Sequence, residues 1–398
     1  MANAHQVKAE LKYRSLWVGR AMGLSAGLLV AGCATVVPRG VPQAPPPVVV
    51  APPPVTTELP TDTGRHRIAL LVPLNGTYAG AGQAIANAAN MAVLDTGGQS
   101  LRVTTYDTSA GAAAAAQKAL REGNQLILGP LLADDVRAIA PATRAAHVPV
   151  VSFTNDTAAG GNGVWIMGFV PGQSINRVVS YAAEKGIMKL AGLAPTNVYG
   201  QRASTILLRA TESAGGQVVS MQSYDHNSAS MAAAVTKLKQ GSAFDGVLIA
   251  DSGKDAVLVA PLIRRSGGAN ARILGTELWN IDRNLGQTSA LVGAWYASVS
   301  DGLFNQLSVK YRARYGKAPP RVASLGYDAV LLAAKIAPDW KGGAAFPLSK
   351  LTDRGGFTGI DGVFRFTRDG TSERGLQVNQ VTANGATVVS PAPQSLGN

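Results

Sequence analysis

Residues 67–95 read RIALLVPLNGTYAGAGQAIANAANMAVLD, and the order of their side chains decides the fold class. Residues 68–72 form a short, continuously apolar run, which is typical of a strand buried on both faces. From residue 83 to residue 95, apolar residues recur at i, i+3, i+4 and i+7, the spacing of one helix face. A buried strand followed directly by a helix indicates a parallel sheet covered by helices.

The same alternation continues along the chain. Further strand-like runs are residues 101–106, 126–128, 148–152, 218–224, 246–250, 272–275 and 295–299. Helical patterns lie between them, at residues 112–122, 134–146, 174–185, 201–213, 231–240 and 254–265. We therefore predict an α/β fold with right-handed crossovers. The chain after residue 64 is long for one doubly wound sheet, so we expect two such lobes joined by hinge strands.

We expect the first lobe to comprise residues 65–168 and 300–355, and the second lobe residues 169–299 and 356–398. Residues 357–366 indicate a terminal hairpin that covers an edge or the hinge. Ligands of such sheets bind at the carboxyl ends of the strands. The segments to inspect for a site are 73–82, 106–108, 129–135, 152–156, 195–200, 251–254 and 276–282.

The N-terminus indicates export and anchoring. Residues 1–20 are basic and residues 21–32 carry no charge, which is typical of a secretory signal too short to span a membrane. The signal ends in Val-Ala-Gly followed by Cys33, the single cysteine of the chain, and this pattern resembles a bacterial lipobox. We expect residues 1–32 to be removed and Cys33 to be lipidated. Ala34 in place of an aspartate favours the outer membrane over the inner one.

Residues 33–64 follow as a linker that is rich in proline, which favours extended polyproline II geometry over pairing in a sheet. In a chain of 398 residues with 46% hydrophobic residues, the rest is a globular protein with a sizeable core. The formal charge of +12 is scattered and does not alternate with aromatic residues, so we expect no nucleic-acid partner. It indicates either a solvated basic face or attraction to an acidic envelope partner.

Several catalytic sets are absent from the sequence. His66, His147 and His226 are too widely spaced for a recognisable metal motif, and no serine lies three residues before a lysine. Glycines 76, 80 and 82 match neither the dinucleotide fingerprint nor the P-loop. We predict a protein that is not an enzyme and needs no cofactor or metal, although a carboxylate pair for glycoside hydrolysis stays open.

At this point four segments resemble one family. Residues 67–95, residues 126–156, Tyr199-Gly200 and residues 311–335 are similar to the type 1 periplasmic solute-binding fold. The resemblance implies two lobes with a ligand between them. Candidate ligand-binding residues are Asn75, Thr77, Tyr78, Ser152, Thr154, Tyr199 and Glu277. Of these, Glu277 would meet an amine. In the alternative interpretation these residues only cap helices and close turns, and Trp279 and Tyr296 belong to the core rather than stacking on a ligand.

Two branches of this family compete. Leucine-type binding proteins serve ABC importers and hold the ligand carboxylate with a serine where this chain has residues 131–135, whose Asp134 and Asp135 would repel it. Lipoprotein activators of penicillin-binding proteins are the other branch, and residues 129–132, 276–280 and 356–366 resemble it closely. These activators carry an N-terminal helical-repeat domain, and the proline-rich linker stands in its place.

The leading hypothesis is therefore a non-catalytic periplasmic lipoprotein, anchored in the outer membrane. It would regulate peptidoglycan synthesis by binding and activating a penicillin-binding protein. The alternative is a solute-binding protein for branched-chain or related amino acids, in which two lobes close around the ligand.

Overall fold

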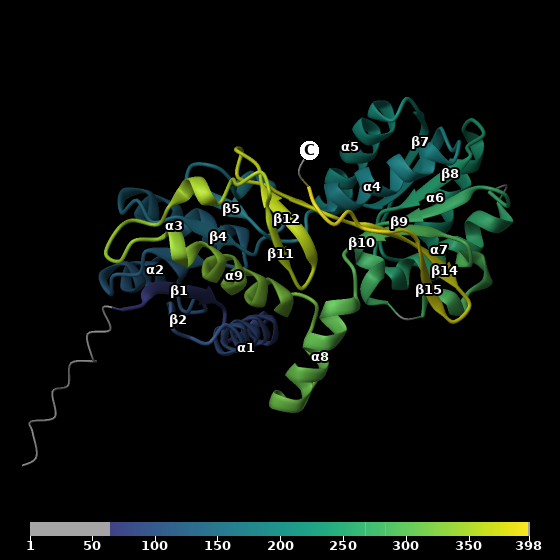
Figure 1. The fold of residues 1–398 in the computed structure, drawn as a ribbon. Helices are drawn as coiled ribbons and strands as arrows, with labels where there is room; N and C mark the ends of the chain where they lie inside the picture. Colours follow the sequence, from purple (N-terminus) through teal and green to yellow (C-terminus); the bar gives the residue numbers. More distant parts are fainter. Residues whose placement is uncertain (1–63, 267, 283, 397–398) are drawn as a thin grey trace, which may run out of the picture. The chain divides into compact units, whose positions relative to one another are not determined.

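The computed structural model describes residues 64–396 except 267 and 283. The predicted signal peptide, Cys33 and nearly all of the proline-rich linker lie outside these residues. The described residues belong to one compact unit of the chain. Their strands form three sheets (Figure 1). Within this part of the chain, no helix has the length and hydrophobicity needed to cross a bilayer.

The first sheet is parallel and has the strand order β2-β1-β3-β4-β5. Its strands are β1 His66–Val72, β2 Leu101–Asp107, β3 Leu126–Leu128, β4 Val150–Ser152 and β5 Val164–Ile166. Its helices are α1 Ala79–Asp95, α2 Ala112–Arg121, α3 Ala133–Ala145 and α9 Ala323–Ile336. Alternate residues of β1 join two different apolar clusters, one with α1 and α9 and the other with α2 and α3. Helices therefore cover both faces of this sheet.

The second sheet has the order β15-β14-β10-β9-β8-β6-β7. Its strands are β6 Lys189–Pro195, β7 Gln217–Tyr224, β8 Gly246–Ile249, β9 Arg272–Gly275, β10 Trp295–Ser298, β14 Gln377–Thr382 and β15 Gly385–Ser390. Strands β6 to β10 are parallel, and β14 and β15 add an antiparallel edge. Helices α4 Pro171–Glu184 and α5 Val198–Ser213 pack on one face, and α6 Ser228–Gln240 and α7 Gly253–Arg265 on the other. The predicted α/β fold with parallel-sheet lobes is confirmed.

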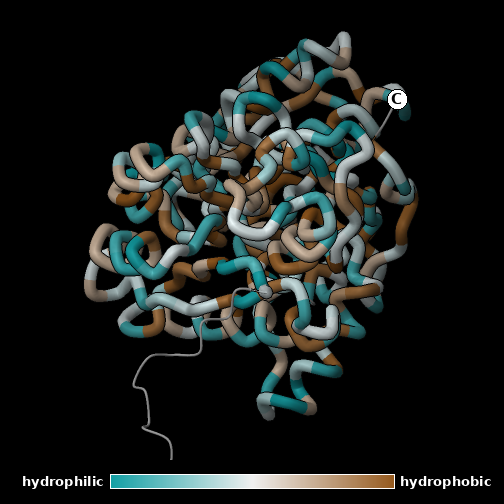
Figure 2. The backbone as a smooth tube through the Cα atoms, turned by 60° about the vertical axis from the view of Figure 1, so that its left-hand side comes forward, coloured by the Kyte–Doolittle hydropathy of each residue, from teal (hydrophilic) through white to brown (hydrophobic). Residues whose placement is uncertain are grey.

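Helix α8 and the 3-10 helices are the remaining helical elements of the described residues. Helix α8 is Gly302–Tyr315, and the 3-10 helices are η1 Thr157–Ala159, η2 Glu277–Ile281, η3 Leu285–Gln287, η4 Ser289–Leu291, η5 Ala337–Asp339 and η6 Leu348–Lys350. The chain leaves the first sheet after β5, leaves the second after β10 and re-enters it at β14. Figure 2 shows hydrophobic segments gathered inside the described part and hydrophilic segments around its outside.

The third sheet corrects the predicted lobe boundary. Strands β11 Phe357–Gly359, β12 Gly362–Phe366 and β13 Ser372–Arg374 are antiparallel, so the predicted hairpin exists with one additional strand. The sequence placed residues 356–398 with the second lobe. Residues 357–374 instead belong with the first, because Phe357, Phe364 and Phe366 are buried in the same apolar cluster as β1, α1 and α9. Only β14 and β15 join the second sheet.

A buried carboxylate holds the β11–β12 turn against α9. Asp328 has no exposed surface, and its carboxylate accepts the backbone N–H of Ile360 at 2.6 Å. Asp361, in the same turn and equally buried, accepts hydrogen bonds from Ser324 and Arg321, each at 2.6 Å. Burial, followed by the charge of Asp361, raises the pKa of Asp328 to about 7. The turn therefore fixes Arg321, which precedes α9.

In both large sheets, one helix lies very close to the end of the strand that precedes it. A Cβ on Gly82 of α1 would lie 1.8 Å from the carbonyl oxygen of Pro73, just after β1. A Cβ on Gly200 of α5 would lie 1.8 Å from the carbonyl oxygen of Pro195, at the end of β6. In both places the absent side chain lets the helix approach the strand end, so each glycine sets the position of the loop between them.

We expect Gly82→Ala to destabilise the protein by about 1–3 kcal/mol, because the added methyl group forces α1 away from β1. Gly80→Ala is the matched control in the same helix, since a Cβ there meets nothing within 4 Å. That control should be neutral or stabilising by up to about 1 kcal/mol, because alanine favours helix over glycine. Chemical denaturation of both variants checks this, and equal stabilities would contradict the contact.

We also expect Asp328→Asn to gain stability relative to the unsubstituted protein as the pH rises from about 4 to about 7. The unfolded carboxyl ionises near pH 4, whereas the folded one stays protonated up to about 7. Ionising it in the folded protein is unfavourable, so its contribution to stability falls between these values and stays low above them. Denaturation series at several pH values measure the difference. A difference that does not change with pH would contradict the assignment.

Candidate functional site

A cavity of about 630 Å³ lies at the carboxyl ends of strands from both large sheets. Its walls come from the loop before α1, the segments after β3, β4, β5 and β9, the end of β10, the start of α9 and the β13–β14 connection. Four of the seven segments that the sequence singled out contribute, namely 73–82, 129–135, 152–156 and 276–282. Its volume is that of a small-molecule site.

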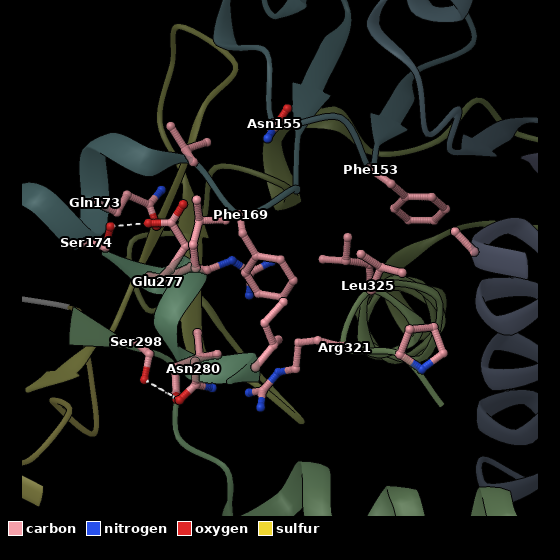
Figure 3. A pocket seen from close by; sticks show the side chains of 18 of the residues that line it. Phe153, Asn155, Phe169, Gln173, Ser174, Glu277, Asn280, Ser298, Arg321 and Leu325 are labelled. Carbon is pink, nitrogen blue, oxygen red and sulfur yellow. Dashed lines mark hydrogen bonds between the residues drawn. The ribbon is translucent and has the colours of Figure 1, made fainter. Parts of the chain in front are cut away.

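The cavity wall is mainly apolar, with polar groups at separate places. Its apolar lining is Ala81, Leu131, Leu132, Phe153, Phe169, Val170, Leu278, Ile281, Val299, Pro320, Val322, Leu325 and Leu376. The polar lining is Tyr78, Asn155, Gln173, Ser174, Glu277, Asn280, Ser298, Arg321 and Arg374. Figure 3 shows Glu277 and Ser174 on one side of the cavity, with Phe153 and Leu325 on the other. This arrangement suits a ligand with an apolar body and few polar groups.

Glu277 is the acidic group of the wall. It begins η2, directly after β9, and its carboxylate accepts hydrogen bonds from the hydroxyls of Ser174 and Tyr199, the latter at 3.3 Å. The hydroxyls of Tyr199 and Thr276 are 3.0 Å apart. Burial raises the pKa of Glu277, and the two hydroxyl donors act in the opposite direction. Glu277 can therefore pair with an ammonium group when ionised, or with a hydroxyl group.

Arg321 is a basic residue of the cavity wall, and neighbouring carboxylates already neutralise its charge. Its guanidinium donates to the carboxylates of Asp301 and Asp361, the second at 2.6 Å, and to the carbonyl of Ser300 at 3.0 Å. It also lies 4.4 Å from the ring centroid of Phe304. With these partners, Arg321 has little capacity left for a ligand charge.

The structure places the predicted site residues in the cavity lining, behind the lining or away from the cavity. Tyr78 and Glu277 line the cavity, and Tyr199 supports Glu277 from outside its lining. Asn75, Thr77, Ser152 and Thr154 are not part of the lining. Trp279 and Tyr296 are buried core residues, and the Trp279 indole donates to the carbonyl of Asp251 at 3.1 Å.

Hydrogen bonds within the protein explain why three polar candidates lie elsewhere. The Asn75 amide donates to Asp107 at 2.7 Å. The Ser152 hydroxyl donates to the carbonyl of Pro130 at 2.8 Å and accepts from the Thr154 N–H at 3.1 Å. The Thr154 hydroxyl accepts the backbone N–H of Asp156 at 3.2 Å. These side chains close turns, as the alternative interpretation of the sequence proposed.

Sequence reasoning missed Phe153, Phe169, Asn280 and Arg374. Phe153 alternates with Ser152 and Thr154, so an extended chain that buries the two hydroxyls turns the phenyl ring toward the other side. That periodicity was the one local signal for a cavity residue. Arg374 carries no such signal, because β13 reaches the cavity only through the folding of the third sheet.

A second group of ionisable residues lies at the end of β8. Ligand atoms of His226, Asp251 and Asp255 lie within 4.8 Å of one another. Asp251 accepts hydrogen bonds from Tyr224 and lies 2.9 Å from a ring nitrogen of His226. Asp255 caps its own helix with Ser252. These mutual bonds account for the cluster, and we assign no metal to it.

Three solved structures of similar fold illustrate what this chain resembles. A putative branched-chain amino acid ABC transporter protein from Rhodospirillum rubrum matches with a TM-score of 0.71 and 18% identity, covering 82% of this chain and 100% of that one. A branched-chain amino acid binding protein from Streptococcus pneumoniae, bound to isoleucine, matches at 0.58 and 21%, covering 82% and 100%. A solute-binding protein from R. palustris, bound to benzoate, matches at 0.60 and 17%, covering 84% and 98%.

These identities establish the fold and leave the ligand of this chain open. A comparison with curated proteins finds no match. A family model described as periplasmic binding protein matches residues 66–386. That range includes the first sheet, the second sheet up to the start of β15, and every segment that lines the cavity. The chain therefore belongs to the periplasmic binding protein family.

Proposed function

We propose that this protein binds a small, largely apolar solute in the cavity and does not transform it. The observation that carries the proposal is the cavity itself, about 630 Å³ in volume, with apolar walls and a partly buried carboxylate. Such a site gives binding energy through buried apolar area and orientation through a few polar groups. Family membership supports the non-catalytic assignment and implies a periplasmic location.

Two classes of solute suit the apolar lining of the cavity and its carboxylate. Structures of similar fold hold isoleucine in one case, and benzoate or hydroxylated benzoates in others. Each of these ligands combines an apolar body with a carboxylate. Isoleucine also has an ammonium group for an ionised Glu277, and a hydroxybenzoate has a hydroxyl group for the same side chain. The original alternative, a binding protein for branched-chain or related amino acids that serves an ABC importer, is one form of this proposal.

Calorimetry of the purified protein against isoleucine, leucine, phenylalanine and hydroxybenzoates tests it. We expect one of these classes to bind. If amino acids bind, their affinity for Glu277→Gln should be at least tenfold lower than for the unsubstituted protein, because the ammonium group loses its counter-charge. Amino-acid affinity should also rise with pH as Glu277 ionises above its raised pKa. Glu212→Gln, on the exposed side of α5, is the control and should change nothing. No binding by any of these solutes at millimolar concentration would refute the proposal.

Regulation of peptidoglycan synthesis is the second candidate function, and the observation that favours it concerns residues 129–132 and 276–280. Both segments resemble activators of penicillin-binding proteins, and both contribute lining residues to the cavity. Residues 356–366, the third such segment, contain Asp361, which holds Arg321 in the cavity wall. In this proposal Cys33 carries the lipid anchor, the outer membrane holds it, and the proline-rich linker lets the domain reach a synthase.

Stimulated glycan polymerisation by a purified bifunctional penicillin-binding protein would support this function. Ile281 ends η2, directly after residues 276–280, and is 71% exposed, so we expect Ile281→Glu to weaken the stimulation. Val309, in α8 and 72% exposed, provides the matched control Val309→Glu, which should leave it unchanged. The absence of stimulation by the unsubstituted protein, or equal loss in both variants, would contradict the proposal.

A further inference from the structure

Arg374 is the least satisfied charged group in the cavity wall. It ends β13, is 7% exposed and lines the cavity. Its Nη2 donates to the carbonyl of Met167 at 2.6 Å. Among the described residues, its Nε and Nη1 are buried without any hydrogen-bond partner. A buried guanidinium with two unpaired donors is unfavourable unless another group pairs with it.

The neighbouring carboxylates are already bound elsewhere. Asp361 accepts from Arg321 and Ser324, and Asp328 accepts the N–H of Ile360. Both carboxylates favour the charged form of Arg374 at longer range, against the effect of burial, which lowers its pKa. Neither forms an ion pair with Arg374 within the described residues. Because arginine does not deprotonate in proteins, this guanidinium is a buried charge without a direct counter-ion.

Aromatic rings cover the guanidinium. The ring centroids of Phe169 and Phe364 each lie 5.2 Å from its central carbon. Phe364 is buried in the core, whereas Phe169 is only partly buried and lines the cavity, where Figure 3 shows its ring among the lining side chains. Phe169 is the less buried of the two rings, so a rotation of its side chain is the movement that would open the unpaired donors to the cavity.

The rest of the wall offers no competing cation. The segment after β3 presents Leu131 and Leu132, followed by Asp134 and Asp135 at the start of α3. Arg321 pairs with two carboxylates, those of Asp301 and Asp361, and keeps one unpaired donor, its Nε, whereas Arg374 has two unpaired donors and no carboxylate partner. A negatively charged ligand group therefore finds its most favourable position at Arg374.

We propose that Arg374 is the anion subsite of the cavity and binds the carboxylate of a small carboxylic acid with an apolar body. The inference rests on the proposed solute-binding function and specifies the ligand class. The carboxylate accepts hydrogen bonds from the donors that Phe169 now covers, the body lies along Phe153 and Leu325, and Glu277 faces the other polar group. Arg374 acts here as a ligand-binding residue.

Matched acid and amide pairs test the subsite on the unsubstituted protein. The probes are benzoate with benzamide, and isoleucine with isoleucinamide, titrated by calorimetry. We expect the acid to bind at least tenfold more tightly than its amide in the pair that fits, because only the acid gains a charge-assisted hydrogen bond. Acid and amide binding alike would overturn the anion subsite and leave solute binding intact. No binding by any of the four at millimolar concentration would overturn both.

Substitutions of Arg374 test whether this residue causes the preference for the acid over the amide. Arg374→Gln should remove the preference for the acid, and Arg374→Lys should keep part of it, because lysine retains the charge. Arg365→Gln is the control from the neighbouring strand, where Arg365 pairs with Glu373 at 2.6 Å and does not line the cavity. Thermal unfolding of each variant verifies folding. Should Arg374→Gln fail to fold, the lysine variant decides, and an unchanged acid preference in a folded Arg374→Gln would refute the assignment.

Discussion

Each parallel sheet must bury two faces at once, and the rest of the structure depends on this constraint. Alternate side chains of β1 enter two apolar clusters with different helices, and β6 does the same in the second sheet. With both faces covered, the strand ends are where loops can carry polar groups without disturbing the core. The cavity is built at these ends, and glycines 82 and 200 fix how closely the helix that follows β1 or β6 approaches that strand.

The sequence predicted most of the parallel strands, but it missed β5, β6, β13, β14 and β15, and β6 shows why. Residues 189–195 read KLAGLAP, which has no β-branched residue and contains glycine and proline. The small side chains are explained by packing: a Cβ on Gly192 would lie 2.5 Å from the sulfur of Met221 and 2.7 Å from Leu207. This strand exists because neighbouring elements surround it, so tertiary contacts decide where local propensity does not.

The site was predicted to the segment and not to the side chain. Hydroxyl groups were selected after β4 because they suit a polar ligand, yet Ser152 and Thr154 bind the backbone and Phe153 faces the cavity. The family resemblance named Glu277, and this residue lies two positions after the end of β9 and does line the cavity. Arg374 could not be found in this way, since its role depends on the third sheet and on the partners that Asp328 and Asp361 already have.

The two candidate functions are physically compatible. Lining residues come from both large sheets, so a bound solute favours whichever arrangement of these segments it contacts best. A partner protein that contacts residues 276–280 would act on the same segments. Linkage then requires that the solute change partner affinity by the same factor as the partner changes solute affinity. A coupling factor of one would mean that the loops serve the two functions independently, and any other value would make the solute a regulator of the partner.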